Sequence, residues 1–249
     1  MIVLKTAKEL HAMRDAGRIT AGALKAAGDA IRPGMTTKAL DEVMHKFILS
    51  KGAKPSFLGY GGFPGCACIS INDEVIHGIP SHDRVIHEGD IVSVDVGAYY
   101  EGYHGDSAFT FAVGEVSDDA KKLLEATQAS LIAGIAAAKP GARLGDVSHA
   151  VQATIEPYGY GIVKKFVGHG VGRDLHEAPD VPNYGEAGRG VRLTAGMTIA
   201  IEPMINLVGE DVTILKDGWT VKTVSKSLSA HFEHTIAITP DGAEILTKL

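Results

Sequence analysis

One internal repeat constrains this chain more than any other feature of its sequence. Arg32-Pro33-Gly34 recurs as Lys139-Pro140-Gly141, 107 residues later. In both copies an acidic residue follows the proline by 62 residues: Asp95 in the first copy and Glu202 in the second. A chance recurrence of Pro-Gly would not preserve that spacing. We therefore expect two related halves that place two carboxylates at equivalent positions.

The segments around the repeat alternate between helical and strand patterns. Apolar residues at helical spacing predict a helix on each side of both Pro-Gly pairs, and the preceding helices fall near 7–31 and 119–138. Each half then continues into segments in which apolar and polar residues alternate, as in strands with one buried face. The pattern favours one α+β domain over 1–249, with halves of about 1–115 and 116–249. Helices would cover one face of a curved sheet that all strands share.

Two neighbouring strand patterns carry acids on the same face. The segments 91–96 and 104–111 are joined by a turn near Gly102. If the turn is tight, Asp95 and Asp106 become cross-strand neighbours, on the face opposite the valines and phenylalanines. Glu202 and Glu233 occupy comparable places in the second half. We therefore expect four carboxylates on the concave side of the sheet.

Four converging carboxylates repel one another unless protons or cations neutralise them. The glycine-rich segment 168–172 adds His169, whose imidazole can supply a nitrogen ligand. A set of oxygen donors with one imidazole suits a pair of divalent ions. The chain has two cysteines, Cys66 and Cys68, too few for a disulfide framework or a cysteine-based zinc site. A chain with so few cysteines is typical of a reducing compartment.

Taken together, these residues resemble the methionine aminopeptidase family, type I in its short bacterial form. The resemblance covers nearly the whole chain and rests on these segments, in order: Phe63–Pro80, Gly89–Asp95, Gly102–Asp106, Gly168–Glu177, Ile201–Pro203, Asp217–Trp219 and Glu233–Thr235. It implies a pita-bread fold, a curved and mainly antiparallel sheet covered by helices on one face, with an internal pseudo-two-fold repeat. It also implies a dinuclear metal-dependent hydrolase that removes the initiator methionine from nascent proteins.

The resemblance also implies roles for individual residues. Two divalent ions (Mn, Fe, Co or Zn) would be held by Asp95, Asp106, His169, Glu202 and Glu233, with Asp106 and Glu233 as the bridging ligands. A water or hydroxide between the ions would attack the first peptide bond. Glu202 would relay its proton, His176 would donate to the carbonyl oxygen, and His77 would contact the scissile amide nitrogen. The substrate-binding residues would be Tyr60, Phe63, Cys68, His77, Leu175, His176 and Trp219.

Three residues depart from the family pattern. Leu175 stands where an aromatic residue is common and Phe57 where a smaller one is common, so the shape of the methionine pocket is open. His231 stands where glutamine is more usual. It would lie either beside the metal ligands or at the rim of the site, and we favour the rim.

Two other functions remain open at this stage. A proline-specific peptidase of the same fold would share the five ligands. Such enzymes commonly carry an extra N-terminal domain and lack the Phe63–Pro80 pattern and the Asp217–Trp219 loop. A non-catalytic binding module on the same scaffold would have lost one or more ligands and would often show basic tails.

Composition narrows the partners and the compartment. A net charge of −6 argues against a nucleic-acid-binding protein, which needs a basic face. The charged N-terminal segment is not a secretory signal, and no apolar stretch is long enough to span a bilayer. We expect a cytoplasmic monomer that acts on the N-terminal methionine of nascent polypeptides. Association with the ribosome is implied by the family resemblance alone.

Overall fold

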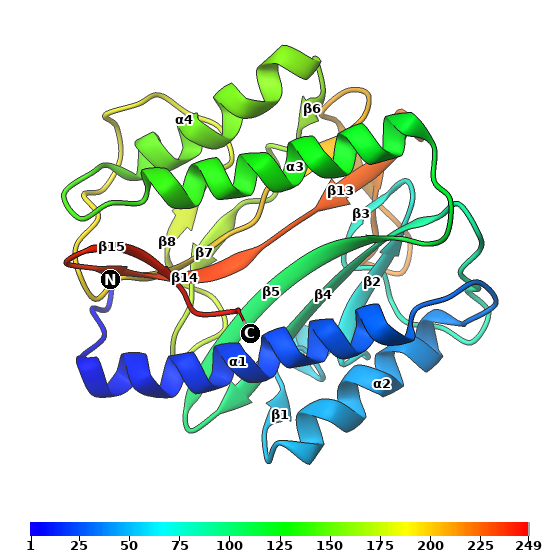
Figure 1. Cartoon of the computed structure of the whole chain (residues 1–249), viewed down its shortest axis with the longest axis horizontal. Coiled ribbons are helices and arrows are strands. Elements are labelled where there is room, and N and C mark those ends of the chain that lie inside the picture. The colour runs from blue at the N-terminus through cyan, green and yellow to red at the C-terminus, as the bar shows by residue number, and fades with distance from the viewer. Residues whose placement is uncertain (249) are drawn as a thin grey trace.

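Four long helices lie on one side of the strands in the computed structural model, which describes residues 1–248 (Figure 1). The helices are α1 (Ala7–Ala30), α2 (Thr37–Ser50), α3 (Asp118–Ala137) and α4 (Leu144–Ile155). Helices α1 and α2 form one pair and α3 and α4 the other, each over its own set of strands. Two short 3-10 helices span Tyr60–Gly62 and Glu156–Tyr158. The predicted helices are confirmed to within one residue at their ends.

The strands are short except for two of ten residues each. They are β1 (Lys54–Pro55), β2 (Ala67–Ile71), β3 (Glu74–Ile76), β4 (Ile91–Tyr100), β5 (Tyr103–Ala112), β6 (Gly161–Ile162), β7 (Gly168–Gly170), β8 (Glu177–Val181), β9 (Thr198–Ile201), β10 (Met204–Asn206), β11 (Val212–Ile214), β12 (Val221–Thr223), β13 (Ser229–His231), β14 (His234–Thr239) and β15 (Gly242–Ile245). All strand pairings in the described part of the chain are antiparallel. The predicted α+β class with a mainly antiparallel arrangement is confirmed.

The strands divide into four hydrogen-bonded sheets, so the expectation of one shared sheet is wrong. The strand orders are β1-β4-β2 with β5 on β4, β13-β10-β6, β11-β12-β3, and β15-β14-β9-β7-β8. Side chains interrupt the ladder where β5 meets β13 and β14. The Thr110 hydroxyl donates to the carbonyl of His231 at 2.7 Å, and the Thr235 hydroxyl donates to the carbonyl of Asp106 at 2.7 Å. These hydroxyl groups thus bond to backbone carbonyls that would otherwise accept from backbone amides of the neighbouring strand in a continuous sheet.

The core lies between the helices and the sheets, in two main clusters. One cluster, under α1 and α2, includes Val92, Val94 and Val96, which are fully buried. The other lies under α3 and α4 and includes Ile199 and Ile201. The alternate residues of the same strands face away from the helices. The strand faces predicted from alternation are therefore confirmed.

A tight turn joins β4 to β5 and sets their register. Glu101 and Gly102 both have positive φ angles, of 48° and 88°, as in a two-residue type I′ turn. Tyr100 consequently pairs with Tyr103, Asp95 with Ala108, and Asp106 with Gly97. Asp95 and Asp106 therefore share a face, as expected, and they are diagonal neighbours that are offset by two residues.

Helices α1 and α3 begin with side-chain caps that hold their first turns. In α1 the Thr6 hydroxyl accepts from the amide of Glu9, and the Glu9 carboxylate accepts from the amide of Thr6 at 2.8 Å. Ser117 caps α3 by accepting from the amide of Ala120. Within residues 1–248, each helix is too short or too polar to cross a membrane.

Candidate active site

A cavity of about 330 Å³ opens among residues that lie far apart in the sequence. It is lined by Phe57, Tyr60, Phe63, Cys68, His77, Asp95, Asp106, His169, Leu175, His176, Glu202, Trp219 and Glu233. The structure therefore brings together the five predicted metal ligands and the seven predicted substrate-binding residues. It adds Phe57, which the sequence had marked only as a departure from the family pattern.

Glycines allow the strand that carries His169 to pack closely between its neighbours. A Cβ atom on Gly168 would lie 2.3 Å from the carbonyl oxygen of Ala200 on β9. A Cβ atom on Gly170 would lie 2.4 Å from the carbonyl oxygen of Ala178 on β8. Because glycine has no Cβ, β7 fits into this narrow space and presents His169 to the acids of β4 and β5.

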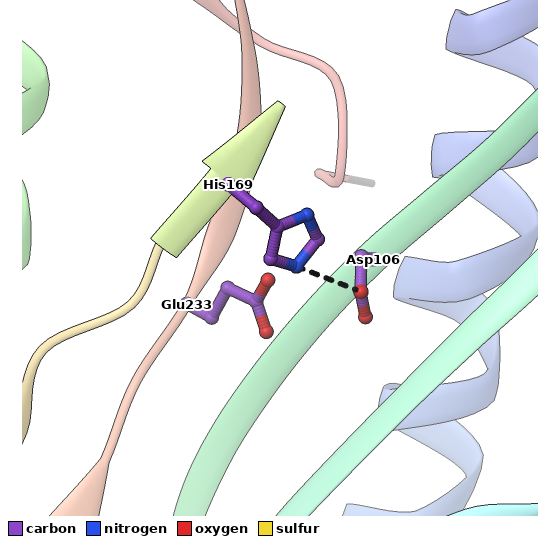
Figure 2. Close-up of side chains that lie close together, drawn as sticks. All are labelled: Asp106, His169 and Glu233. Atoms are coloured by element: carbon purple, nitrogen blue, oxygen red, sulfur yellow. Dashed lines mark ion pairs between the residues drawn. The ribbon is translucent and has the colours of Figure 1, made fainter. Parts of the chain in front are cut away.

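The His169 ring is oriented by its own backbone. Its Nδ1 lies 2.8 Å from the carbonyl oxygen of Gly170, which can only accept, so Nδ1 carries the proton. The lone pair is then on Nε2, which lies 3.7 Å from Oδ2 of Asp106 and 3.6 Å from Oε1 of Glu202. Figure 2 shows His169 on β7, Asp106 on β5 and Glu233, just before β14, pointing toward one another. A backbone acceptor on one nitrogen is the usual arrangement for a histidine that binds metal with the other.

The four carboxyl groups lie next to one another, with Asp106 and Glu233 buried and Asp95 and Glu202 partly exposed, and this changes their acidity. Burial raises the pKa of Asp106 to about 7. Burial, followed by the charges of the neighbouring carboxylates, raises the pKa values of Asp95, Glu202 and Glu233 well above their ordinary range. Burial also lowers the pKa of His169 to about 3, so the imidazole is neutral and does not compensate the acids. Either protons or bound cations can therefore neutralise this group of acids.

The donor atoms fit divalent metal ions. Asp95 Oδ1, Asp106 Oδ1 and Glu233 Oε1 are buried and have no hydrogen-bond partner among residues 1–248. One ligand atom each from Asp106, His169 and Glu233 lie within 4.8 Å of one another. Buried oxygens without partners are rare in proteins and indicate a missing ligand. Carboxylates with one imidazole suit a hard or borderline divalent cation.

Beside the acids the cavity is apolar. Phe57, Phe63, Cys68 and Leu175 form one buried cluster, against which Trp219 packs. The rings of Phe63 and Trp219 meet edge to face at 5.2 Å. Burial raises the pKa of the Cys68 thiol well above its ordinary value, so Cys68 stays protonated and forms a small apolar part of the wall. The large side chain at 57 and the smaller one at 175 thus belong to the same wall.

Tyr60 lies at the mouth of the cavity rather than in the apolar cluster. Its side chain is exposed, its ring stacks on His176 with centroids 5.3 Å apart, and its hydroxyl lies 2.9 Å from Nδ1 of His176. The His176 ring lies 4.0 Å from the His169 ring. Tyr60 therefore fixes the orientation of His176 at the edge of the acid cluster.

His77 lies on the other side, after β3, with a positive φ of 59°. Its ring is perpendicular to those of Phe166 and Trp219. A left-handed backbone at a histidine is strained, and such strain concentrates at functional positions. Burial lowers the pKa of His77 to about 4, so its ring is neutral at physiological pH.

His231 is buried, and the expectation that it lies at the rim is wrong. It is 1% exposed, and its Nε2 lies 3.7 Å from Oε2 of Glu202. The reason is that β13 lies between β10 and β5, where Thr110 bonds both the amide and the carbonyl of His231. Neither ring nitrogen has a hydrogen-bond partner in the part of the chain that the structure describes. Alternation along 231–233 was the one sequence signal for this, since it places His231 on the same face as Glu233.

Sequence reasoning also missed residues that support the site from outside the cavity. The Asn183 amide donates to the carbonyl oxygen of Glu202 at 3.0 Å. Glu177 pairs with Lys5, near the start of the chain. Both contacts join segments that are distant in sequence, and no local pattern announces them.

The sequence and the structure are similar to those of known proteins. Residues 11–240 match the family model of metallopeptidase family M24. Methionine aminopeptidase 1 of Bacillus subtilis is 52% identical over 249 residues, which cover 100% of both chains. A crystal structure of methionine aminopeptidase from Thermotoga maritima has a TM-score of 0.98 at 48% identity, over 100% of both chains. A prolidase from Pyrococcus furiosus has a TM-score of 0.80 at 28% identity, over 99% of this chain and 66% of that one.

Proposed function

The chain belongs to metallopeptidase family M24, and we propose that it is a hydrolase that removes the N-terminal methionine from polypeptides. The observation that carries this proposal is the cavity itself, where an apolar pocket adjoins a buried group of four carboxylates and an imidazole. The pocket suits an unbranched thioether side chain. The acid group suits the cations of a metallopeptidase.

We infer that Asp95, Asp106, His169, Glu202 and Glu233 hold two divalent ions, of manganese, iron, cobalt or zinc. When bound, such ions lower the pKa of a water molecule and polarise the peptide carbonyl. Asp106 and Glu233 are the proposed shared ligands, because both lie in the tight cluster with His169 and each has a buried oxygen without a partner.

The remaining roles belong to side chains around this group. Glu202 lies next to His169 and is proposed to take the proton of the attacking water. With the Tyr60 hydroxyl donating to Nδ1, the neutral ring of His176 carries its proton on Nε2, from which it can donate to the carbonyl oxygen of the substrate. His77, which also lines the cavity, is proposed to contact the scissile amide nitrogen. The free amine of the substrate, bound among the acids, would restrict cleavage to chain ends.

The apolar cluster is proposed to select methionine. Phe63, Cys68, Leu175 and Trp219 enclose the side chain, and Phe57 closes the same wall. Phe57 and Leu175, which pack in the same buried cluster, are proposed to set the shape of this wall. A pocket of this kind discriminates by burying a flexible apolar side chain and by leaving polar side chains without partners.

We also propose that the substrates are nascent polypeptides, that the protein works as a monomer in the cytoplasm, and that it acts near the ribosome. The two buried, reduced cysteines agree with a reducing compartment. The ribosomal part follows only from the substrate class.

The proline-specific alternative has less support. The prolidase relative is 28% identical, and this chain covers 66% of it, whereas the Bacillus subtilis relative is 52% identical over both whole chains. A non-catalytic scaffold is disfavoured because the five proposed ligands all line one cavity.

An assay of metal-stripped protein tests the proposal. With Mn²⁺ or Co²⁺ added back, we expect methionine release from Met-Ala-Ser, about two bound ions per chain, and no cleavage of a Xaa-Pro peptide. Glu202→Ala should abolish release, and Glu210→Ala should not, because Glu210 pairs with Lys164 on the surface. Cleavage of the Xaa-Pro peptide instead would transfer the chain to the proline-specific branch. Absence of both activities, with less than one ion bound, would overturn the assignment as an enzyme.

A further inference from the structure

Lys5 is a buried cation outside the cavity whose role the proposed reaction does not explain. Its side chain is 3% exposed and pairs with the carboxylate of Glu177, which is 11% exposed. Its Nζ also donates to the carbonyl of Val3 at 3.2 Å, and its amide donates to the carbonyl of Gly196 at 2.7 Å. A buried ion pair adds little net stability compared with apolar packing, whereas losing one partner leaves the other charge buried and unpaired. The Lys5–Glu177 pair is therefore better suited to fixing a geometry than to stabilising the fold.

Glu177 connects Lys5 to the turn at Arg173 and Asp174, which precedes Glu177 in the chain. One carboxylate oxygen of Glu177 accepts from the amides of Arg173 and Asp174, at 2.8 and 3.4 Å, and the other pairs with Lys5. Gly172 lies directly against this arrangement. A Cβ atom on Gly172 would lie 2.3 Å from Oε1 of Glu177 and 2.6 Å from Cε of Lys5. The backbone of segment 172–177 thus packs directly against the ion pair, and any side chain larger than that of glycine at position 172 would clash with it.

The same segment carries two residues of the cavity. Leu175 is 2% exposed and is held by packing against Phe57, Phe63 and Cys68. His176 is exposed at the mouth, and apart from Tyr60 and the His169 ring its position depends on the shape of the segment. The carboxylate of Glu177, the next residue, sets that shape. A shift of about 1 Å in a catalytic group can reduce a rate roughly a hundredfold.

A second contact joins the same two regions on the surface. The Glu9 carboxylate accepts from Arg173 at 3.0 Å and from the hydroxyl of Tyr103 at 2.8 Å. The Arg173 side chain is 68% exposed, so solvent screens this ion pair. The buried Lys5–Glu177 pair is therefore the stronger of the two connections.

We propose that Lys5 is a positioning residue for His176: by pairing with Glu177, it holds the segment 172–177 in the shape that places the His176 ring at the mouth of the cavity. The kinetic consequence rests on the proposed function, but the structural consequence does not. Leu175 is held by its own apolar contacts, so the loss of Lys5 should affect catalysis more than methionine binding.

The test compares Lys5→Met, which keeps the length of the side chain and removes its charge, with Arg14→Met as a control. Arg14 also pairs with a distant glutamate, Glu244 at 2.7 Å, but on β15 and away from the segment. For Met-Ala-Ser we expect Lys5→Met to lower kcat about 10- to 100-fold and to change KM less than about threefold. In a His176→Ala background the same substitution should lower kcat less than about twofold, because Lys5 acts through His176. Arg14→Met should retain wild-type kcat.

Hydrogen exchange gives a readout independent of activity. In the wild type the Arg173 and Asp174 amides donate to the Glu177 carboxylate. Lys5→Met should speed the hydrogen exchange of these two amides, and Arg14→Met should not. Unchanged exchange would overturn the structural part, even if the wild type releases no methionine and the proposed function itself fails. Wild-type kcat in Lys5→Met, or an equal loss of kcat in the His176→Ala background, would overturn the positioning role. If Lys5→Met does not fold, Glu177→Gln is measured in its place with the same expected results. Lys5→Arg keeps the positive charge, so its kcat should stay within about threefold of the wild-type value.

Discussion

Asp41 holds the beginning of the strand that forms one wall of the cavity, and its substitution is expected to be strongly destabilising. It lies on α2, 2% exposed. Its Oδ1 accepts from the amides of Cys66 and Ala67, at 2.7 and 3.0 Å, and its Oδ2 accepts from Lys38 at 2.7 Å. Cys66 directly precedes β2 and Ala67 begins it, and Cys68 of the same strand pairs with Asp95 on β4.

The magnitude follows from what each substitution leaves without a partner. Asp41→Ala leaves two buried amide donors unsatisfied, at about 1–3 kcal/mol each, while the ammonium of the partly exposed Lys38 turns to water. For the two amides together we therefore expect a loss of about 2–6 kcal/mol in the free energy of unfolding. Asp41→Asn keeps an acceptor for the amides and loses only the charge, so its loss should be about 1 kcal/mol.

Urea denaturation of the metal-stripped protein, followed by circular dichroism, measures these differences. The expected order of stability is wild type, then Asp41→Asn, then Asp41→Ala. Asp29→Ala serves as the control, because Asp29 is an exposed partner of Lys25 and its loss should change stability by less than about 0.5 kcal/mol. An Asp41→Ala protein within about 1 kcal/mol of the wild type would refute the reasoning, since the two amides would then have found other acceptors.

Two further expectations concern acidity. The amide of Thr6, followed by the Tyr103 hydroxyl, lowers the pKa of Glu9 from 4.5 to about 2; this adds stability above pH 4.5 that is lost as the pH falls toward 2. Glu9→Gln should thus be about 1 kcal/mol less stable at pH 7 and closer to the wild type at pH 3 in urea titrations, and an equal gap at both would contradict the linkage. Burial raises the pKa of Cys66 to about 12 and that of Cys68 well above its ordinary value. Ellman's reagent at pH 8 should therefore find no fast thiol in the folded protein and two in urea, and one rapid thiol before unfolding would refute this.

The faces of the strands could be predicted from the sequence because alternation is a local property. Val92, Val94 and Val96 point to the core on one face of β4, and Asp95 points to the other face. Successive residues of a strand alternate between its two faces wherever the strand packs. The repeat then placed Asp95 and Glu202 at equivalent positions. Alternation and the repeat, with the family resemblance, were enough to name the residues that line the cavity, apart from Phe57.

Features that depend on contacts between distant segments could not be predicted in this way. The offset between Asp95 and Asp106 depends on which two residues occupy the turn, and several choices fit the same alternation. The division into four sheets depends on hydroxyl groups such as those of Thr110 and Thr235, which bond the backbone of other strands. The burial of His231 follows from the same contacts.

The proposed ligands enter the chain at widely spaced times when it is synthesised. Asp106 and Glu233 are 127 residues apart in sequence, yet their ligand atoms lie within 4.8 Å in the folded protein. At about 5–20 residues per second, roughly 6–25 s pass between the addition of the first and the addition of the second. During that interval the growing chain holds Asp95 and Asp106 but lacks the group that completes their cluster. On the proposed ligand assignment, a product truncated before Glu233 lacks one of the ligands, and we expect such a fragment to release no methionine.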